Sequence, residues 1–532
     1  MGTGLQTLDW AVFIFYFIVV AGYGFWIYNR KRTGSTSSND YFLAEGSLTW
    51  WAIGASLIAS NISAEQFIGM SGSGFNMGLG ISTYEWMAAA TLLTVGVFFM
   101  PIYLKNKIFT MPQFLNTRYN ATVSTIMAIF WLFLYVFVNL TAILYLGALA
   151  ISTIAGLNFD YCMWFLAAFA IIITLGGMKV IGYTDVIQVF FLVIGGLATT
   201  YMAVSLVSQQ YGTTGLMEGV HAMQQNAGDH FHMIFPKGNP HYMALPGLTV
   251  LIGGMWIANL NYWGCNQYIT QRALGADLKT SRQGILFAAF LKMLMPIIVV
   301  VPGIAAYVLH QKGMFQQEML KDGVLNQDNA YPVLLNLLPV GLKGLSFSAL
   351  TAAIVASLAG KANSISTIFT LDIYRKFIGK DATEEQLVLV GRGTVVVALI
   401  IAIIASPYMG IDKKGGFQFI QEMTGLVSPG LFAAFFMGFF WKKTNSEGAL
   451  FAIVGGFIMA LAMHYKMQDI PFLDRMGYVF CICVAVMVVL GLLKPSDKGL
   501  EVDSSMFRVD KGFAIGAGII LTMIVALYTY FW

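Results

Sequence analysis

The sequence predicts an all-α polytopic membrane protein with about 14 transmembrane helices. Hydrophobic residues make up 58% of its 532 positions and charged residues only 11%, which leaves too few polar groups to cover a water-soluble globule. The apolar residues also fall into runs of about twenty, the length that crosses a bilayer core. The connections between the runs are too short to form an extramembrane catalytic or ligand-binding domain.

Fourteen apolar runs are the candidate transmembrane helices. In chain order they cover residues 9–28, 51–75, 79–104, 122–155, 159–177, 184–209, 247–270, 283–310, 339–377, 387–407, 415–441, 446–465, 471–493 and 511–531. The first run follows Asp9 and lacks the basic leader and cleavage site of a signal peptide, so it is predicted to remain as a spanning helix. An even number of spans places both chain ends on the same side of the membrane.

The lysines and arginines of the connections predict which side that is, because cytoplasmic loops carry more of them. Connections after odd-numbered runs hold twenty basic residues, including Arg118 and Arg272, and connections after even-numbered runs hold eight. We therefore predict that the N and C termini lie outside and that the protein is a multi-pass protein of the cell membrane. The two remaining basic residues, Lys292 and Lys361, fall inside predicted spans.

Two of the predicted spans are interrupted by small and polar residues. The second contains Asn61 within GASLIASNISAEQFIGMSGSG, and the seventh contains Gly264 within GGMWIANLNYWGCNQY. Such residues let a membrane helix unwind where it lines a cavity, which frees backbone carbonyls to hold a cation. Hydrogen bonding between helices is the alternative for either stretch alone. Because the breaks lie five spans apart, we expect two inverted five-helix repeats with a site between them.

This expectation divides the chain into five segments. They are a first helix with a cytoplasmic linker at 1–50, a first inverted repeat at 51–209, an external loop at 210–246, a second inverted repeat at 247–441 and three C-terminal helices at 442–532.

Several classes of protein are disfavoured by what the sequence lacks. The net charge of +4 is small and the basic residues are scattered, so no nucleic-acid partner is expected. No Walker loop or Ser-His-Asp grouping appears, which disfavours an ATP-driven pump and a membrane hydrolase. The four cysteines lie in apolar stretches and no histidine is spaced to complete a metal site with them. The protein is therefore predicted not to be an enzyme.

Ionisable residues at membrane depth are candidates for a binding site, because an unpaired charge there costs at least roughly 2.5 to 3.5 kcal/mol. Four stand out, namely Glu65, Glu85, Asp185 and Lys292. Combined with amide side chains, these groups suit a polyhydroxyl ligand, whose hydroxyls each need a partner once dehydrated. An aromatic residue could cover the apolar face of a sugar ring. The alternative is that Glu85 and Lys292 only pair with one another as a structural ion pair.

A colinear series of motifs between about residue 40 and residue 443 resembles one known family. The motifs are WWAIGASLIASNISAEQFIGMSGSGF, YEWMAA, YTDVIQVFFLVIGG, WIANLNYWGCNQYITQR, FAAFLK, PGIAAYV, STIFTLDIYRKF, FQFIQEMTGLVSPG and FFWKKT. They are similar to the sodium/solute symporters, and within them to the sodium/glucose and sodium/galactose cotransporter branch.

The resemblance implies a LeuT-like core of two inverted repeats, with one helix before it and three after. It also implies inward symport of a hexose, galactose or glucose, with Na⁺ as the co-transported ion, by alternating access. Two alternatives stay open: sodium-coupled transport of myo-inositol or another polyol or sugar, and a sugar sensor that does not transport. The expected partners are the sugar, sodium and the lipid bilayer, and the oligomeric state is not given by the sequence.

The resemblance further implies which residues form the site. The sugar-binding positions are Asn61, Gln66, Glu85, Asn259, Lys292 and Gln421, together with Tyr262, which would stack on the ring and form the inner gate. The outer gate positions are Met70, Tyr84 and Phe417. The sodium ligands would be the carbonyls of Ala59, Ile62 and Ala353 and the hydroxyl of Ser357, with Asp185 on the sodium exit route.

The sequence departs from the family pattern at three positions. Ala88 stands where the pattern has a sugar-contacting serine, Asn261 where a tyrosine is usual, and Ala356 where a second serine would precede Ser357. The first two departures leave the exact sugar open. The third removes an expected sodium ligand, so either water replaces it or sodium binds more weakly.

Lys361 suggests a further hypothesis about coupling. We expect its ammonium to pair with Asp185, which would neutralise both charges and oppose a second bound cation. Together with the missing hydroxyl at Ala356, this arrangement predicts one sodium ion per sugar. The alternative is that the long side chain of Lys361 extends to the inner membrane interface.

Overall fold

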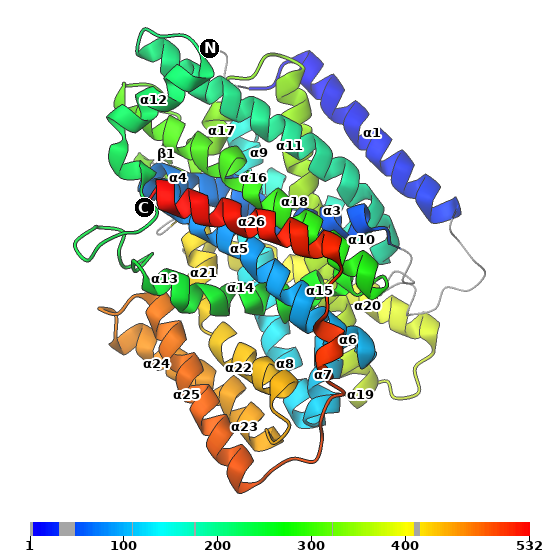
Figure 1. The fold of residues 1–532 in the computed structure, drawn as a ribbon. Coiled ribbons are helices and arrows are strands. Elements are labelled where there is room, and N and C mark those ends of the chain that lie inside the picture. The colour runs from blue at the N-terminus through cyan, green and yellow to red at the C-terminus, as the bar shows by residue number, and fades with distance from the viewer. Residues whose placement is uncertain (1–3, 31–47, 109, 175–176, 322, 409–414) are drawn as a thin grey trace.

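The computed structural model describes residues 4–30, 48–108, 110–174, 177–321, 323–408 and 415–532. In these ranges the chain forms a bundle of crossing helices (Figure 1), and its two-stranded sheet is a short ribbon of β1 (Leu320–Lys321) and β2 (Val324–Leu325). The predicted all-α architecture is confirmed. Most of the predicted cytoplasmic linker lies outside the described residues, as do Lys31, Arg32, Lys413 and Lys414.

Helices occupy all six ranges that were predicted as spans in the first part of the chain. They are α1 (Thr7–Arg30), α3 (Trp50–Asn61) with η2 (Glu65–Met70) and α4 (Ser71–Met77), α5 (Thr83–Thr94) with α6 (Met100–Lys105), α8 (Ala121–Phe133) with α9 (Thr141–Ala155), α10 (Phe159–Thr174) and α11 (Gly177–Gln210). Segment η2 and the junction η5 (Leu134–Leu140) between α8 and α9 are wider π-helical turns. Such turns are frequent at functional sites.

Helices also occupy the eight predicted ranges in the rest of the chain. They are α13 (Thr249–Ile252) with α14 (Gly254–Gly264) and α15 (Gln267–Ala273), α16 (Leu278–Gln311), α18 (Leu342–Thr367) with η8 (Ile368–Tyr374), α20 (Glu384–Ala405), α21 (Gly416–Gly425) with α22 (Ser428–Phe440), α23 (Ser446–Leu450) with α24 (Gly456–Lys466), α25 (Phe472–Leu493) and α26 (Lys511–Tyr530). Helices α7 (Met111–Arg118) and α12 (Leu216–Asn226) lie in connections.

Nine helical stretches of the described chain are long and apolar enough to cross a membrane, and the bent pair α21 and α22 makes a tenth. Two of the remaining predicted spans contain shorter apolar stretches, Thr7–Val20 and Phe159–Thr174. Of the other two, the second is represented only by its second half, which continues into the third span as the stretch Glu65–Lys105, and the seventh contains no such stretch. These are the two spans for which an interruption was predicted.

Both predicted interruptions are present. Helix α3 ends at Asn61, Ile62 has extended backbone with φ −76° and ψ 105°, and helix resumes at η2. Helix α14 ends at Gly264, and two residues separate it from α15. A third interruption, the 52° bend between α21 and α22, was not predicted. Three helix ends are therefore available to line a central site.

Contacts between connections place both chain ends on one face of the bundle. Near the N terminus, the Asp9 carboxylate accepts hydrogen bonds from the backbone N–H groups of Gly341 (2.7 Å) and Gly344 (2.9 Å). At the other end, the N–H of Met233 donates to the carbonyl of Phe531 (2.7 Å). A small apolar core shared by α12, the ends of α11 and α16 and residues 319–334 joins these connections. The two ends thus lie on the same face, as the even number of predicted spans requires (Figure 1).

The opposite face carries connections that follow odd-numbered predicted spans. Asn106 exchanges two hydrogen bonds with the backbone of Glu501, at 3.0 and 3.1 Å. Arg118, counted above as a loop residue, is 1% exposed and donates to the carbonyls of Gly438 and Trp441 at 2.9 Å. Its guanidinium therefore satisfies carbonyl groups at the end of α22, which have no partner within the helix.

Candidate transport site

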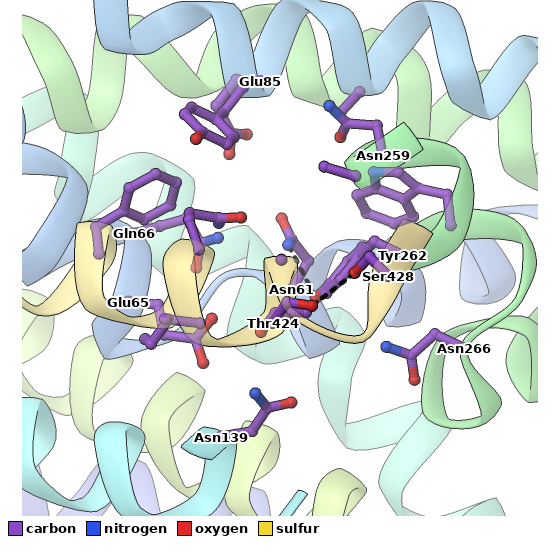
Figure 2. A pocket seen from close by; sticks show the side chains of 18 of the residues that line it. Asn61, Glu65, Gln66, Glu85, Asn139, Asn259, Tyr262, Asn266, Thr424 and Ser428 are labelled. Atoms are coloured by element: carbon purple, nitrogen blue, oxygen red, sulfur yellow. Dashed lines mark hydrogen bonds between the residues drawn. The ribbon is translucent and has the colours of Figure 1, made fainter. Parts of the chain in front are cut away.

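A cavity lies among the three interrupted helices (Figure 2). Its walls are formed by the break after α3, the π-helical turn η2, and residues of η5, α5, α14, α16, α21, α22 and α25. The two spans with predicted interruptions thus border one common cavity, as expected.

All seven residues predicted to bind sugar border this cavity. They are Asn61, Gln66, Glu85, Asn259, Tyr262, Lys292 and Gln421. Their amide, carboxylate, ammonium and phenol groups come from six separate helical segments, so only the folded chain brings them together.

Lys292 is the centre of a buried polar network. Its ammonium lies 2.5 Å from Oε2 of Glu85 and also donates to Oδ1 of Asn61. The ring of Trp263 lies 5.2 Å away from the ammonium, within the range of a cation–π contact. The ion pair between Glu85 and Lys292 is therefore present, and because it lies in the cavity wall, its polar atoms also face the space available to a ligand.

Tyr262 divides the cavity. Its hydroxyl accepts hydrogen bonds from Nδ2 of Asn61 (3.0 Å) and from the hydroxyl of Tyr268 (2.6 Å). Figure 2 shows Glu85 and Asn259 on one side of Tyr262, and Asn139 and Asn266 on the other. A half-buried ring held between two polar compartments has the position that an inner gate requires.

Tyr84 and Phe417 close the cavity at another point. Their rings meet edge to face with centroids 5.0 Å apart, and both residues are buried. Helix α21 approaches η2 so closely that a Cβ at Gly69 would lie 2.8 Å from the backbone nitrogen of Phe417, so this contact requires glycine. Met70, predicted as the third outer gate residue, is fully buried and is not among the residues that line the cavity.

The break in α3 leaves backbone carbonyls without their helical partners. The N–H of Ser63 donates to Oε1 of Gln66 (3.2 Å), and it is therefore not committed to the carbonyl of Ala59. The N–H groups of Gln66 and Phe67 both bond to the carbonyl of Ser63, which leaves the carbonyl of Ile62 outside the helical pattern. These are two of the predicted sodium ligands.

Helix α18 brings the other two predicted sodium ligands to this break. The hydroxyl of Ser357 lies 3.3 Å from the carbonyl of Ser60, which fixes α18 beside the end of α3. Ala353 lies one turn earlier on the same helix and is buried. Carbonyl and hydroxyl oxygens are hard ligands that suit Na⁺.

The predicted pairing of Lys361 with Asp185 is wrong. Asp185 accepts a hydrogen bond from Ser56 (2.7 Å) and lies 3.7 Å from the guanidinium of Arg272. Lys361 instead donates to Oε1 of Glu65 at 3.1 Å. The side chain of Lys361 is 1% exposed, so it does not extend to a membrane interface either. Arg272, assigned to a loop from the sequence, belongs to the buried helix α15.

The three departures from the family pattern have different surroundings. Ala88 lines the cavity directly. Asn261 does not line it, but its Nδ2 donates to the hydroxyl of Ser428 (3.0 Å), which does. Ala356 is buried beside Ser357 on α18. Only the first departure therefore changes the cavity wall itself.

The cavity also contains residues that the sequence analysis missed. Trp263 and Tyr268 flank Tyr262 within the same predicted break, so their motif could have indicated them. Phe472 and Met476 come from α25, outside the predicted ten-helix core, and no pattern in the sequence marks them.

Interrupted helices that enclose a buried polar cavity between two aromatic closures are the features of a secondary transporter. A model of the sodium:solute symporter family matches residues 41–456, and the chain belongs to this family. It is thus a sodium-coupled transporter rather than an enzyme, with Na⁺ as the co-transported ion.

Two curated relatives are similar over most of their length. The sodium/glucose cotransporter of Vibrio parahaemolyticus is 49% identical over 99% of both chains. Human sodium/myo-inositol cotransporter 2 is 33% identical over 86% of this chain and 70% of its own length.

Solved structures show the same fold. A Na⁺-coupled sialic acid symporter in a substrate-bound outward-open state aligns with a TM-score of 0.79 at 22% identity, over 93% of this chain and 99% of its own. Mhp1 in an inward-facing conformation aligns with a TM-score of 0.56 at 14% identity, over 90% of this chain and 99% of its own. At these identities the likeness concerns the fold alone.

Proposed function

We propose that this protein carries a hexose, galactose or glucose, into the cell together with sodium by alternating access. The main support is the cavity in which Glu85, Lys292 and four amide side chains surround a space bordered by the rings of Tyr262 and Trp263. A pyranose has hydroxyl groups around its rim, which need polar partners, and apolar ring faces, which suit an aromatic ring. The 49% identical relative, named as a sodium/glucose cotransporter, favours the same class of substrate.

Sodium is proposed to bind at the carbonyls of Ala59, Ile62 and Ala353 and the hydroxyl of Ser357. The first two carbonyls belong to the same break that positions Asn61 and Gln66 in the cavity wall. An ion that orders this break also orders the sugar site, which is a physical basis for coupling. Asp185 is proposed to lie on the exit route, where its pairing with Arg272 has to open before an ion can pass.

The proposed architecture has fourteen transmembrane helices, two inverted repeats at 51–209 and 247–441, and both ends outside the cell membrane. Three observations support this architecture. Helices occupy all fourteen predicted ranges, and each proposed repeat begins with a broken helix. The two chain ends lie on the same face of the bundle. The larger number of basic residues on the other face favours a cytoplasmic location for it.

One sodium ion supplies enough energy for accumulation. Moving a single charge across 100 mV yields about 2.3 kcal/mol. A tenfold sodium gradient adds roughly 1.4 kcal/mol. Together they could sustain a sugar gradient of roughly several hundredfold.

Myo-inositol or another polyol is the second candidate substrate. Several relatives at 31% to 33% identity are named as sodium/myo-inositol cotransporters, and Ala88 removes a hydroxyl that the hexose pattern contains. The remaining alternative, a sugar sensor, would use the same cavity to bind its ligand without moving it across the membrane.

Uptake by purified protein in proteoliposomes tests the proposal. Labelled galactose, glucose and myo-inositol would be compared under an inward sodium gradient, with potassium replacing sodium as the control. We expect sodium-dependent accumulation of a hexose that disappears when the gradient is dissipated. Accumulation of the polyol alone would reassign the substrate, and binding without flux would identify a sensor.

A further inference from the structure

A second buried ion pair has one member, Glu65, in the cavity wall, and neither the proposed sugar site nor the proposed sodium site includes this pair. Lys361 of α18 donates to Oε1 of Glu65 in η2 at 3.1 Å, and the two side chains are 1% and 8% exposed. The ammonium also lies 5.0 Å from the ring centroid of Tyr268. Because an unpaired charge at this depth is costly, each group stabilises the charged form of the other.

This pair lies next to the proposed sodium ligands on the same two elements. Lys361 follows Ser357 by one helical turn, about 6 Å along the axis of α18. Glu65 begins the helix that resumes after the break at Ile62, and Ala59 lies in the last turn of the helix before this break. The ammonium of Lys361 is therefore a fixed positive charge about one helical turn from Ser357, one of the ligands proposed for the mobile sodium ion.

The partner of this fixed charge is itself part of the cavity wall. Glu65 borders the compartment that also contains Asn139 and Asn266 (Figure 2). Without the ammonium, a buried carboxylate would face the polar side chains of this compartment with no counter-charge. A carboxylate in such a setting attracts a small cation.

We propose that the ammonium of Lys361 is a resident cation of the transport site, which neutralises Glu65 and excludes a second mobile cation, so that one sodium ion moves with each sugar. This inference rests on the proposed function. Because the ammonium is tethered to α18, it compensates Glu65 without crossing the membrane. The predicted stoichiometry thus agrees with the sequence hypothesis, but the carboxylate involved is Glu65 and not Asp185.

The test is the ratio of charge moved to sugar moved, measured in proteoliposomes at clamped membrane potentials. We expect one charge per sugar for the wild type and for Lys361→Arg, which keeps the cation. We expect two charges per sugar for Lys361→Met, because sodium then occupies the position beside Glu65. The double variant Lys361→Met/Glu65→Gln should return to one, since the carboxylate that attracts the second ion is gone.

These variants distinguish an effect on the number of ions transported per sugar from an effect on folding. A merely structural pair would change the transport rate or the protein yield but not the ratio. Lys376→Met is a matched control, since it removes a lysine that forms a partly exposed pair with Asp372 (3.5 Å) at the end of the same helical stretch. It should leave the ratio at one.

Three results would overturn the inference. They are a wild-type ratio near two, an active Lys361→Met variant whose ratio stays at one, and a double variant whose ratio stays at two.

If Lys361→Met does not fold, Glu65→Gln provides the test. An ammonium left unpaired beside the sodium ligands should raise the sodium half-saturation concentration about tenfold or more, and an unchanged value would count against the proposal. Sodium-independent sugar uptake by the wild type would instead refute the proposed function, and the inference with it.

Discussion

Arg272 and Asp185 form a buried ion pair with a hydroxyl between them. The guanidinium lies 3.7 Å from the carboxylate, and the hydroxyl of Ser56 accepts a hydrogen bond from Nε of Arg272 (2.8 Å) while it donates to Asp185 (2.7 Å). The three residues belong to α15, α11 and α3, so the pair joins both interrupted helices to a long helix beside them.

Removing one member of this pair should destabilise the protein strongly. Arg272→Met leaves the carboxylate of Asp185 buried without its counter-charge, which typically costs about 3 to 5 kcal/mol. We expect a lower thermal unfolding temperature for this variant in detergent. The double variant Arg272→Met/Asp185→Asn should recover much of the loss, and strictly additive effects of the two substitutions would show that the groups do not interact.

Glu85→Ala should abolish hexose uptake, and because it leaves the buried ammonium of Lys292 without its counter-charge, uptake is normalised to the amount of folded protein. The substitution removes the partner of Lys292 and one wall of the proposed sugar site. The measurement is uptake at saturating sodium, with Glu447→Ala as the control because its ion pair with Lys494 is exposed and contributes little. Wild-type uptake by Glu85→Ala would show that the sugar site is assigned wrongly.

Two substitutions of Tyr262 distinguish its ring from its hydroxyl. Tyr262→Phe loses the hydrogen bonds to Asn61 and Tyr268 but keeps the ring that is proposed to stack on the sugar. It should retain most of the transport rate, whereas Tyr262→Ala should lose at least about tenfold, within the range of a stacking and burial contribution. Equal initial rates for the two variants would remove the argument for stacking.

Ala88→Ser should increase the apparent affinity for hexose. The added hydroxyl would face the cavity and supply one hydrogen bond, with a net contribution of about 0.5 to 1.5 kcal/mol, which corresponds to a roughly two- to tenfold lower half-saturation concentration. Ala89→Ser is the matched control, since Ala89 is buried but does not line the cavity. An unchanged or higher half-saturation concentration for Ala88→Ser would contradict the placement of sugar hydroxyls at this wall.

Ala356→Ser and Ser357→Ala should shift sodium affinity in opposite directions. The first adds an oxygen beside the proposed ligands, and the second removes the hydroxyl that lies 3.3 Å from the carbonyl of Ser60. We expect the sodium half-saturation concentration to fall about threefold or more for Ala356→Ser and to rise about tenfold or more for Ser357→Ala. If Ser357→Ala leaves this concentration unchanged, sodium binds elsewhere.

The sequence by itself determined the class of fold and the positions of two interruptions. A bilayer requires long apolar helices, and this requirement is visible in composition and run length alone. The breaks after Asn61 and Gly264 were also predictable, because small and polar residues act on the backbone locally. The seven sugar-site residues came from a resemblance to known transporters, and the structure places all of them around one cavity.

Only the tertiary structure decided which side chains face each other. The partner of Lys361 depends on the rotation of α18 about its axis and on its approach to η2, and both are set by packing against neighbouring helices rather than by residues nearby in sequence. For the same reason Arg272 lies in the core instead of a loop, and Asn261 contacts Ser428 behind the cavity wall. Helix α25 contributes Phe472 and Met476 because the fold brings it against α14 and α22, an approach that no local pattern encodes.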